Sequence, residues 1–258
     1  MMDGTDSVKV ERREQGRVLH LLLDAPKPNV LDATMVRGLA AALEAHGDDP
    51  ALRAIVFEGA GPSFSYGASV AEHTRDRAEA MLTRFHGVFR QLSDLGVPTL
   101  AVVRGACLGG GLELAAWCSW LFAAPDATFG QPEIKLAVFP PMASLLLPWR
   151  VGGGRALDLC VSGRTIAAAE AHALGLVHEV VPDPAEACAR FISAQLLPKS
   201  GPSLRFAERA ARGELDRLLA TALPELERLY LDQLMATPDA NEGIAAFIER
   251  RPPRWVTP

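Results

Sequence analysis

The sequence has few cysteines, and none of them are paired at metal-binding spacing. The four cysteines, Cys107, Cys118, Cys160 and Cys188, lie among apolar neighbours, and none belongs to a CxxC pair. This pattern predicts reduced cysteines in the core and argues against a redox centre or a metal site.

Long apolar runs and an excess of basic residues are also missing. No run reaches the ~20 apolar residues of a membrane-spanning helix, and the polar, acidic start lacks the apolar core of a signal peptide. The 258 residues carry 26 basic and 31 acidic side chains, a net charge of −5. This balance argues against a nucleic-acid-binding face. With 49% hydrophobic residues, we expect a globular cytoplasmic protein with a large core that binds neither membrane nor nucleic acid.

Four common catalytic motifs are absent as well. The sequence contains no GxxxxGK[ST], no GxGxxG after a strand, no GxSxG and no HExxH. Their absence removes P-loop nucleotide hydrolysis, Rossmann redox chemistry, serine hydrolysis of the usual kind and zinc proteolysis as leading interpretations.

The pattern of apolar runs predicts an α/β protein. Apolar runs typical of buried strands occupy residues 17–24, 51–59, 99–105 and 119–125. Helical spacing at residues 33–46, preceded by Asp32 as a cap, and at residues 77–95 alternates with these runs. Such alternation predicts a mainly parallel sheet covered on both faces. We interpret His86, in the second helix, as a partly buried structural histidine.

Beyond residue 150 the chain is predicted to be mostly helical. Helices are expected at residues 153–160, 166–174, 184–197, 201–212, 214–236 and 241–250, with one strand at 176–181. A break near residue 200 divides a core of residues 1–199 from a C-terminal region of residues 200–258. The many apolar positions of residues 214–236 predict burial between the subunits of an oligomer.

A glycine-rich run after the third strand is the first candidate site. Residues 104–114 read RGACLGGGLEL and join a buried strand to an apolar helix. A helix that begins near Gly110 presents free N–H groups that suit a developing oxyanion, and Glu113 lies in its first turn. The alternative is a plain tight turn in which Glu113 only favours the start of the helix.

Two further segments extend this candidate site. We expect Glu133, in the segment FGQPEI of residues 129–134, on a loop beyond the fourth strand. Alone it would be a solvated loop residue, but paired with Glu113 beside an apolar pocket it could hold a water and move protons in both directions. Gly67 permits an unusual backbone angle, which makes the N–H of Ala68 a candidate second oxyanion donor.

These segments, in this order, resemble the crotonase, or enoyl-CoA hydratase/isomerase, superfamily over about residues 15–251. Matching segments also occur at residues 26–31, 163–166, 170–171, 175–177 and 242–251. The resemblance implies a spiral of ββα units with a helical C-terminal trimerisation region, assembled as a trimer or a dimer of trimers. It also implies a lyase that hydrates an acyl-CoA, with no metal and no cofactor, because CoA is part of the substrate.

The resemblance assigns roles to individual residues. The N–H groups of Ala68 and Gly110 match the family's oxyanion hole for a thioester carbonyl, and Glu113 and Glu133 match its two catalytic glutamates. The other residues that match substrate- or CoA-binding positions are Lys27, Asn29, Ser65, Tyr66, Gly67, Gly109, Phe139, Phe247 and Arg250.

One segment departs from ordinary members of the family. Residues 138–144 read VFPPMAS, where ordinary hydratases have a glycine-rich stretch that helps to shape the acyl pocket. Together with residues 64–73, this segment is similar to the subfamily that hydrates cyclohexa-1,5-diene-1-carbonyl-CoA in anaerobic aromatic degradation. The implied substrate is therefore a cyclic dienoyl-CoA.

Three alternatives to this substrate assignment stay open. One is a general 2-enoyl-CoA hydratase, and another is an isomerase or dehydratase of the same family. The third, more remote, is a non-catalytic structural or RNA-binding trimer, against which the two glutamates and the acidic pI of about 5.7 argue.

Overall fold

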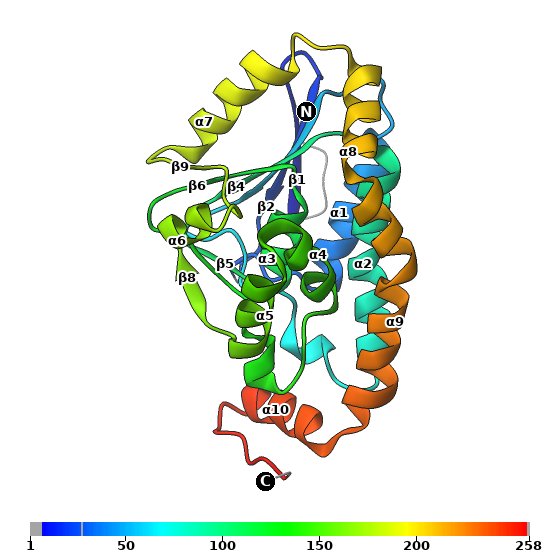
Figure 1. Cartoon of the computed structure of the whole chain (residues 1–258), viewed down its shortest axis with the longest axis vertical. Coiled ribbons are helices and arrows are strands. Elements are labelled where there is room, and N and C mark those ends of the chain that lie inside the picture. Colours follow the sequence, from blue (N-terminus) through cyan, green and yellow to red (C-terminus); the bar gives the residue numbers. More distant parts are fainter. Residues whose placement is uncertain (1–6, 27, 257–258) are drawn as a thin grey trace.

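Two sheets organise the computed structural model, which describes residues 7–26 and 28–256 (Figure 1). The larger sheet has the strand order β1-β2-β3-β4-β6-β9, and the smaller has the order β5-β7-β8. In the larger sheet β1 pairs antiparallel with β2 and the other neighbours pair in parallel, which confirms the predicted mainly parallel sheet. The strands are β1 Val8–Arg13, β2 Val18–Leu23, β3 Ala54–Gly59, β4 Thr99–Val103, β5 Ala106–Leu108, β6 Trp120–Ala123, β7 Thr128–Gly130, β8 Thr165–Ala167 and β9 Glu179–Val180.

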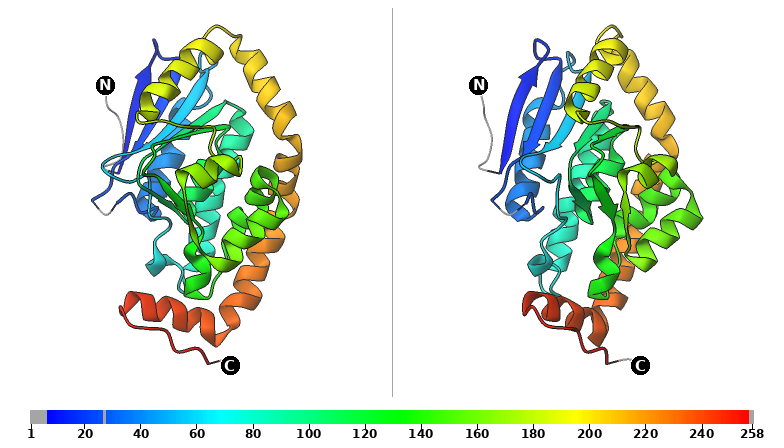
Figure 2. Two further views of the ribbon diagram at one scale, coloured as in Figure 1. Left: turned by 60° about the vertical axis from the view of Figure 1, so that its left-hand side comes forward. Right: turned by 90° about the vertical axis from the view of Figure 1, so that its left-hand side faces the viewer.

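Helices cover the large sheet and form most of the C-terminal part. Figures 1 and 2 show α8 and α9 running down one side of the molecule before the chain turns into α10. The α-helices are α1 Ala33–His46, α2 Ala78–Leu95, α3 Gly110–Trp117, α4 Pro141–Val151, α5 Gly153–Ser162, α6 Ala168–Ala173, α7 Pro184–Phe191, α8 Gly201–Thr221, α9 Leu223–Arg228 and α10 Pro238–Ile248. Shorter turns are the 3-10 helices η1 Val70–Glu72, η2 Pro132–Leu136 and η5 Leu234–Ala236 and the π-helices η3 Ile192–Leu196 and η4 Leu229–Gln233. None of these described helices is both long and apolar enough to cross a membrane.

The strands of the large sheet are apolar because both of their faces are buried. Leu19 and Leu21 of β2 pack on one face in the same cluster as the buried sides of α1 and α2. Val18 and Val56 pack on the other face, which α7 and η3 cover with side chains such as Ile192. Alternate residues thus belong to different apolar layers, and the strands read as continuous apolar runs.

Several elements of the core differ from the prediction. β1 was not expected, because Val8 and Val10 alternate with exposed charged side chains, as is common in an edge strand. β5 was not expected either, since it has 3 residues. The helix predicted over residues 166–174 is wrong at its start, where β8 occupies Thr165–Ala167 and pairs with β7.

The C-terminal helices differ from the prediction in two ways. The break expected between two helices is absent, because α8 continues through Gly213. A glycine inside a helix costs about 1 kcal/mol, which packing on either side can offset. The apolar side chains expected between subunits are instead buried within the chain: Leu215, Leu219 and Leu223 join the main core, and Tyr230 joins a cluster with α2 and α10.

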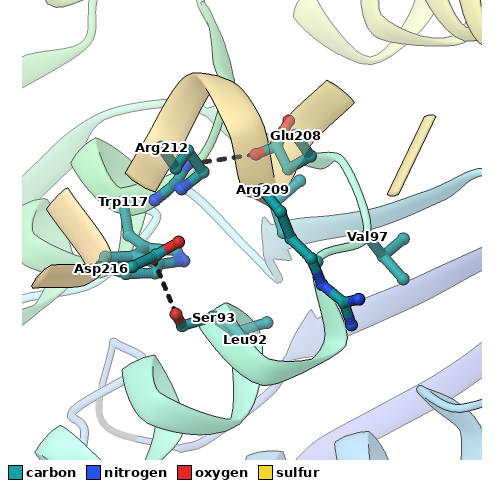
Figure 3. Close-up of a pocket in the computed structure, with 10 residues that line it drawn as sticks. Leu92, Ser93, Val97, Trp117, Glu208, Arg209, Arg212 and Asp216 are labelled. Atoms are coloured by element: carbon teal, nitrogen blue, oxygen red, sulfur yellow. Dashed lines mark hydrogen bonds and ion pairs between the residues drawn. The ribbon is translucent and has the colours of Figure 1, made fainter. Parts of the chain in front are cut away.

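A buried polar cluster fastens α8 to the rest of the chain (Figure 3). The guanidinium of Arg212 lies 4.2 Å from the centre of the Trp117 ring and pairs with Glu208 at 3.3 Å. Ser93 of α2 donates a hydrogen bond to Asp216 at 2.7 Å. The side chains of Arg212 and Glu208 are 7% and 12% exposed, so removing one would leave the other charge poorly solvated.

Arg212→Ala should lower the free energy of unfolding by about 3 kcal/mol, because it leaves the Glu208 carboxylate buried without this partner. Urea unfolding of both proteins measures the difference. Arg217→Ala is the matched control, since Arg217 pairs with Glu214 on the same helix but both side chains are largely exposed. Its effect should be small. Equal losses in the two variants would show that the buried cluster does not anchor α8.

Candidate active site

Two loops bring free backbone N–H groups together. The segment after β3 pairs with β5 through hydrogen bonds from Ser65 N to Ala106 O and from Leu108 N to Ser65 O, each 3.0 Å long. This pairing places the nitrogen of Ala68 3.3 Å from the position that a β-carbon on Gly110 would occupy. The two predicted oxyanion donors are therefore neighbours.

Glycines make this close approach possible. Gly67 has φ +92°, and a β-carbon there would lie 2.8 Å from the carbonyl oxygen of Leu108. Gly109 has φ 51° and ψ −127° and turns the chain out of β5 into α3. A larger residue at either position would strain the backbone and separate the two loops.

The N–H groups of Ala68 and Gly110 donate no hydrogen bond to another part of the described chain. Gly110 is the first residue of α3, where no earlier turn supplies an acceptor. Two neighbouring N–H groups, of which that of Gly110 lies at a helix N-terminus, suit the oxygen of a thioester that gains negative charge. That contact stays a prediction for both residues.

Glu113 and Glu133 line one cavity beside these amides. Glu113, in the first turn of α3, is 5% exposed and accepts a hydrogen bond from the N–H of Ala143 at 2.7 Å. Glu133 lies in the 3-10 helix η2 rather than on the predicted open loop. A β-carbon on Gly109 would lie 2.5 Å from Oε1 of Glu133, so this glycine also makes room for the second carboxyl group.

Burial raises the pKa of both carboxyl groups. The pKa of Glu113 rises to about 7, because the loss of water outweighs the hydrogen bonds from the backbone of Ala143 and Met142. The pKa of Glu133 rises to about 8, through burial first and the charge of Glu113 second. The residue Glu133 keeps some exposed surface, but its carboxyl group is enclosed. Two carboxyl groups with raised pKa values allow one group to be ionised while the other keeps its proton near neutral pH, so one can accept a proton while the other donates one.

The segment of residues 138–144 has two roles in this cavity. Phe139, Pro140 and Pro141 form part of its wall. Pro141 also begins α4, a helix that the sequence did not predict, and the start of α4 supplies the Ala143 N–H that holds Glu113. The predicted rigid wall of the acyl pocket is thus also a support for a carboxyl group.

An open cleft of about 680 Å³ leads from Ala68 to the C-terminal segment. Tyr66 and Phe247, which are 52% and 57% exposed, lie along it together with Arg250. Lys135 also lines the cleft, although it was not predicted; its place two residues beyond Glu133 is the signal that could have found it. A long cleft with cationic and apolar side chains suits a ligand that carries phosphates on one end and an acyl group on the other.

Two of the predicted binding residues support the loop instead of lining the cleft. Asn29 accepts the N–H of Ala25 at 3.1 Å and donates to two backbone carbonyls. Ser65 donates to the carbonyl of Asn29 at 2.6 Å. Both residues are at most 1% exposed, so their side chains support the loop. That their segments line the path of CoA stays a prediction. Lys27 lies outside the described residues.

Tyr230, which lines the inner cavity, was not predicted from the sequence. The chain has 2 tyrosines, and both lie at the site: Tyr66 in the cleft and Tyr230 in the cavity. Tyr230 comes from η4, far along the chain, and its ring packs edge-on against Phe139 with 5.5 Å between centroids. Within the described ranges, no group of three or more His, Cys, Asp or Glu side chains could hold a metal ion.

The buried carboxyl pair should reduce stability as the pH rises. Folding raises the pKa of Glu133 from 4.5 to about 8, so between these values the folded state binds the proton more tightly than the unfolded state. The contribution of this group to the free energy of unfolding is therefore largest below the unfolded pKa and is lost as the pH approaches 8. Glu133→Gln removes this titration and should stabilise the protein more at pH 8 than at pH 5.

Urea unfolding at the two pH values measures this difference. Glu214→Gln serves as the control, because hydrogen bonding to Arg217 lowers the pKa of Glu214 and its titration ends below this pH window. The control should show the same effect at both values. A Glu133→Gln effect that is independent of pH would show that the carboxyl group is not held in its protonated form.

Known proteins are similar to this chain over nearly its whole length. The family model for enoyl-CoA hydratase/isomerase matches residues 13–258. The chain is 47% identical over 255 residues to the cyclohexa-1,5-dienecarbonyl-CoA hydratase of Thauera aromatica, which covers 99% of both chains. It is 32% identical over 261 residues to the crotonyl-CoA hydratase of Syntrophomonas wolfei, which covers 98% of both.

Solved structures of enoyl-CoA hydratases are also similar to this chain in fold. An enoyl-CoA hydratase from Mycobacterium avium subsp. paratuberculosis superimposes with a TM-score of 0.84 and 28% identity over 97% of this chain and 98% of the other. An enoyl-CoA hydratase/isomerase from Pseudoalteromonas atlantica gives a TM-score of 0.82 at 28% identity and covers 97% of this chain and 100% of the other. The predicted crotonase-like α/β fold with a helical C-terminal region is confirmed, and the chain belongs to the enoyl-CoA hydratase/isomerase family.

Proposed function

We propose that the protein is a lyase that adds water to an α,β-unsaturated acyl-CoA, and that its substrate is cyclohexa-1,5-diene-1-carbonyl-CoA. The observation that carries this proposal is the pair of enclosed carboxyl groups, Glu113 and Glu133, beside two free and convergent N–H groups. The relative of Thauera aromatica, named as a hydratase of this thioester, supports the same reaction.

The thioester carbonyl would bind between the N–H groups of Ala68 and Gly110. As water adds, negative charge develops on the carbonyl oxygen, and these two donors stabilise it without having to reorient. Loss of one such donor in an enzyme typically costs about 10²–10³ in rate. Because both donors belong to the backbone, their positions depend on the loop geometry that Gly67 and Gly109 permit.

The two carboxyl groups would divide the proton transfers. Ionised Glu113 takes a proton from water while the water oxygen attacks the β-carbon, and protonated Glu133 gives a proton to the resulting enolate. For a cyclic diene, the proton goes to the far end of the dienolate, and the product is a hydroxycyclohexenecarbonyl-CoA. The sum is the addition of one water molecule, so the reaction needs no cofactor besides the CoA of the substrate.

The residues that form the wall of the acyl cavity support a cyclic substrate. Phe139, Pro140 and Pro141 form a wall whose backbone is fixed by the prolines. A rigid wall suits a flat, compact ring better than an extended chain. A general 2-enoyl-CoA hydratase is the second candidate, which the similarity to the crotonyl-CoA hydratase of Syntrophomonas wolfei favours.

We also propose that the protein is a homo-oligomer, a trimer or a dimer of trimers. Large apolar side chains remain exposed on α4 and α5, where Trp149 is 40%, Leu157 65% and Val161 61% exposed. Apolar side chains gathered on two consecutive helices support burial against another copy.

Glu113→Gln and Glu133→Gln should each lower kcat by about 10²-fold or more, because each removes a proton-transfer group. KM for the thioester should change little, since the oxyanion donors and the cleft stay in place. Steady-state kinetics measure both constants, with Glu214→Gln as a folded control on α8. Turnover close to that of the wild type in either variant would exclude that glutamate from the reaction.

The protein should prefer the cyclic dienoyl-CoA to crotonyl-CoA by at least about tenfold in kcat/KM, because a misplaced methylene-sized group costs ~10–200-fold. Side-by-side assays of the two thioesters with one enzyme preparation measure this ratio. Equal or faster use of crotonyl-CoA would assign the protein as a general enoyl-CoA hydratase and leave the roles of Glu113 and Glu133 unchanged.

A further inference from the structure

Two buried polar atoms in the acyl cavity have no hydrogen-bond partner among the described residues. They are Nε2 of His86, on α2, and the hydroxyl group of Tyr230, on η4. Both side chains are 1% exposed, and both line the cavity that contains Glu113 and Glu133. Because an unpaired buried polar group is unfavourable, two of them in one cavity indicate a ligand that satisfies both.

The partner of the other ring nitrogen defines what His86 offers to the cavity. Nδ1 of His86 lies 2.6 Å from Oε1 of Glu227, and Arg90 donates to the same oxygen at 3.0 Å. Burial raises the pKa of Glu227, but His86 and Arg90 together lower it by more, so its net shift is downward. The carboxylate is therefore ionised and accepts hydrogen bonds. His86 must therefore carry a proton on Nδ1.

The imidazole of His86 is neutral near pH 7. Burial lowers its pKa by more than the contact with Glu227 raises it. With the proton on Nδ1, the Nε2 atom carries a lone pair and acts as a hydrogen-bond acceptor in the cavity.

Tyr230 supplies the complementary group. Burial raises the pKa of its hydroxyl first, and the charges of Glu133 and Glu113 raise it further, so the hydroxyl keeps its proton and can donate. The hydroxyl belongs to the same cavity as the carboxyl pair. One acceptor and one donor together match a water molecule or an alcohol, which donates one hydrogen bond and accepts another.

The free volume agrees with a single small oxygen group. The cavity is about 20 Å³ in size, which is enough for one water molecule. An acyl ring enters only if the side chains of the wall move, and it would then bring its own oxygen substituent to the same polar atoms.

We propose that His86 and Tyr230 form a hydroxyl-binding subsite in the acyl cavity, and that it holds the oxygen added in the reaction. This inference rests on the proposed function. Before the addition, the subsite binds this oxygen as water. Afterwards it binds the oxygen as a hydroxyl group on the ring carbon adjacent to the carbon that carries the thioester. His86 accepts a hydrogen bond and Tyr230 donates one, while Glu227 is a positioning residue that acts through His86. The ligand class is a cyclic β-hydroxyacyl-CoA.

The test measures binding, so that it does not depend on turnover. Dissociation constants are determined by calorimetry in the Glu113→Gln background for three saturated thioesters: cyclohexanecarbonyl-CoA, its 2-hydroxy derivative and its 4-hydroxy derivative. The more tightly binding stereoisomer of the 2-hydroxy thioester should bind about tenfold more tightly than the parent thioester. This factor corresponds to two modest hydrogen bonds. The 4-hydroxy thioester should show no such gain.

Tyr230→Phe removes one oxygen atom and should reduce the tenfold gain to about threefold or less, because one of the two hydrogen bonds is lost. His86→Phe should do the same. Binding of the parent thioester should stay within about twofold in both variants, since no hydroxyl group is involved. His178→Phe is the matched control and should keep the full gain, because His178 packs edge-on against Phe122 outside the cavity.

The outcomes separate this subsite from a structural role and from the proposed reaction. A structural role would lower the thermal stability and weaken all three thioesters alike. An unchanged gain in Tyr230→Phe, no gain in the starting protein, or an equal gain for the 4-hydroxy thioester would overturn the subsite. Failure of the proposed function would appear separately, as turnover that survives in the Glu113→Gln variant. The absorbance of the enoyl thioester measures this turnover.

Discussion

Glu113 is buried in the first turn of α3, and the segments around it keep it there. α3 can begin at Gly110 because Gly109 adopts a positive φ, and this start leaves N–H groups free beside the carboxyl group. The N–H of Ala143 at the start of α4 holds the carboxyl oxygen. Glu133 then approaches from η2 through the space that Gly109 leaves open. The enclosed carboxyl group of Glu113 therefore constrains where α3 and α4 begin and requires the glycine turn at Gly109.

This arrangement is unfavourable for folding, and the rest of the protein offsets its cost. Two carboxyl groups lie in one cavity, and the raised pKa of each records the loss of water around it. His86 and Tyr230 add two buried polar atoms that have no partner in the part of the chain that the structure describes. The large sheet, buried on both faces, supplies the apolar packing that lets such a site persist. These two polar atoms lie in the cavity where the proposed chemistry occurs.

The C-terminal helices belong to the site as much as to the scaffold. α8 is fastened to the core by Arg212, which lies over the Trp117 ring, and by Asp216, which accepts a hydrogen bond from Ser93 of α2. The chain that follows delivers Glu227 to His86 and places Tyr230 in the acyl cavity. α10 and the residues after it then line the cleft. The polar contacts of the acyl cavity thus depend on how α8 and α9 pack against α2.

The sequence by itself determined the features that depend on neighbouring residues. Strands buried on both faces were evident as apolar runs, and Asp32 was a recognisable cap, which the structure confirms through its bonds to Thr34 and Met35. The glycines and glutamates of the site were also found, because short segments place them beside helix starts and turns. Their order along the chain resembled a known family, and the comparisons confirm the family.

Tertiary structure decided the features that depend on residues far apart in the chain. The half-exposed strand β1 becomes evident only when it pairs with β2, and α8 continues through Gly213 because packing on both sides outweighs the glycine. Asn29 matched a CoA-binding position of the family, but its side-chain polar atoms form hydrogen bonds with nearby backbone groups. His86 and Tyr230 had no local signal of a shared role. Periodicity reports which side of an element is buried, whereas only the folded chain decides which buried polar atoms meet in one cavity and which are left without a partner.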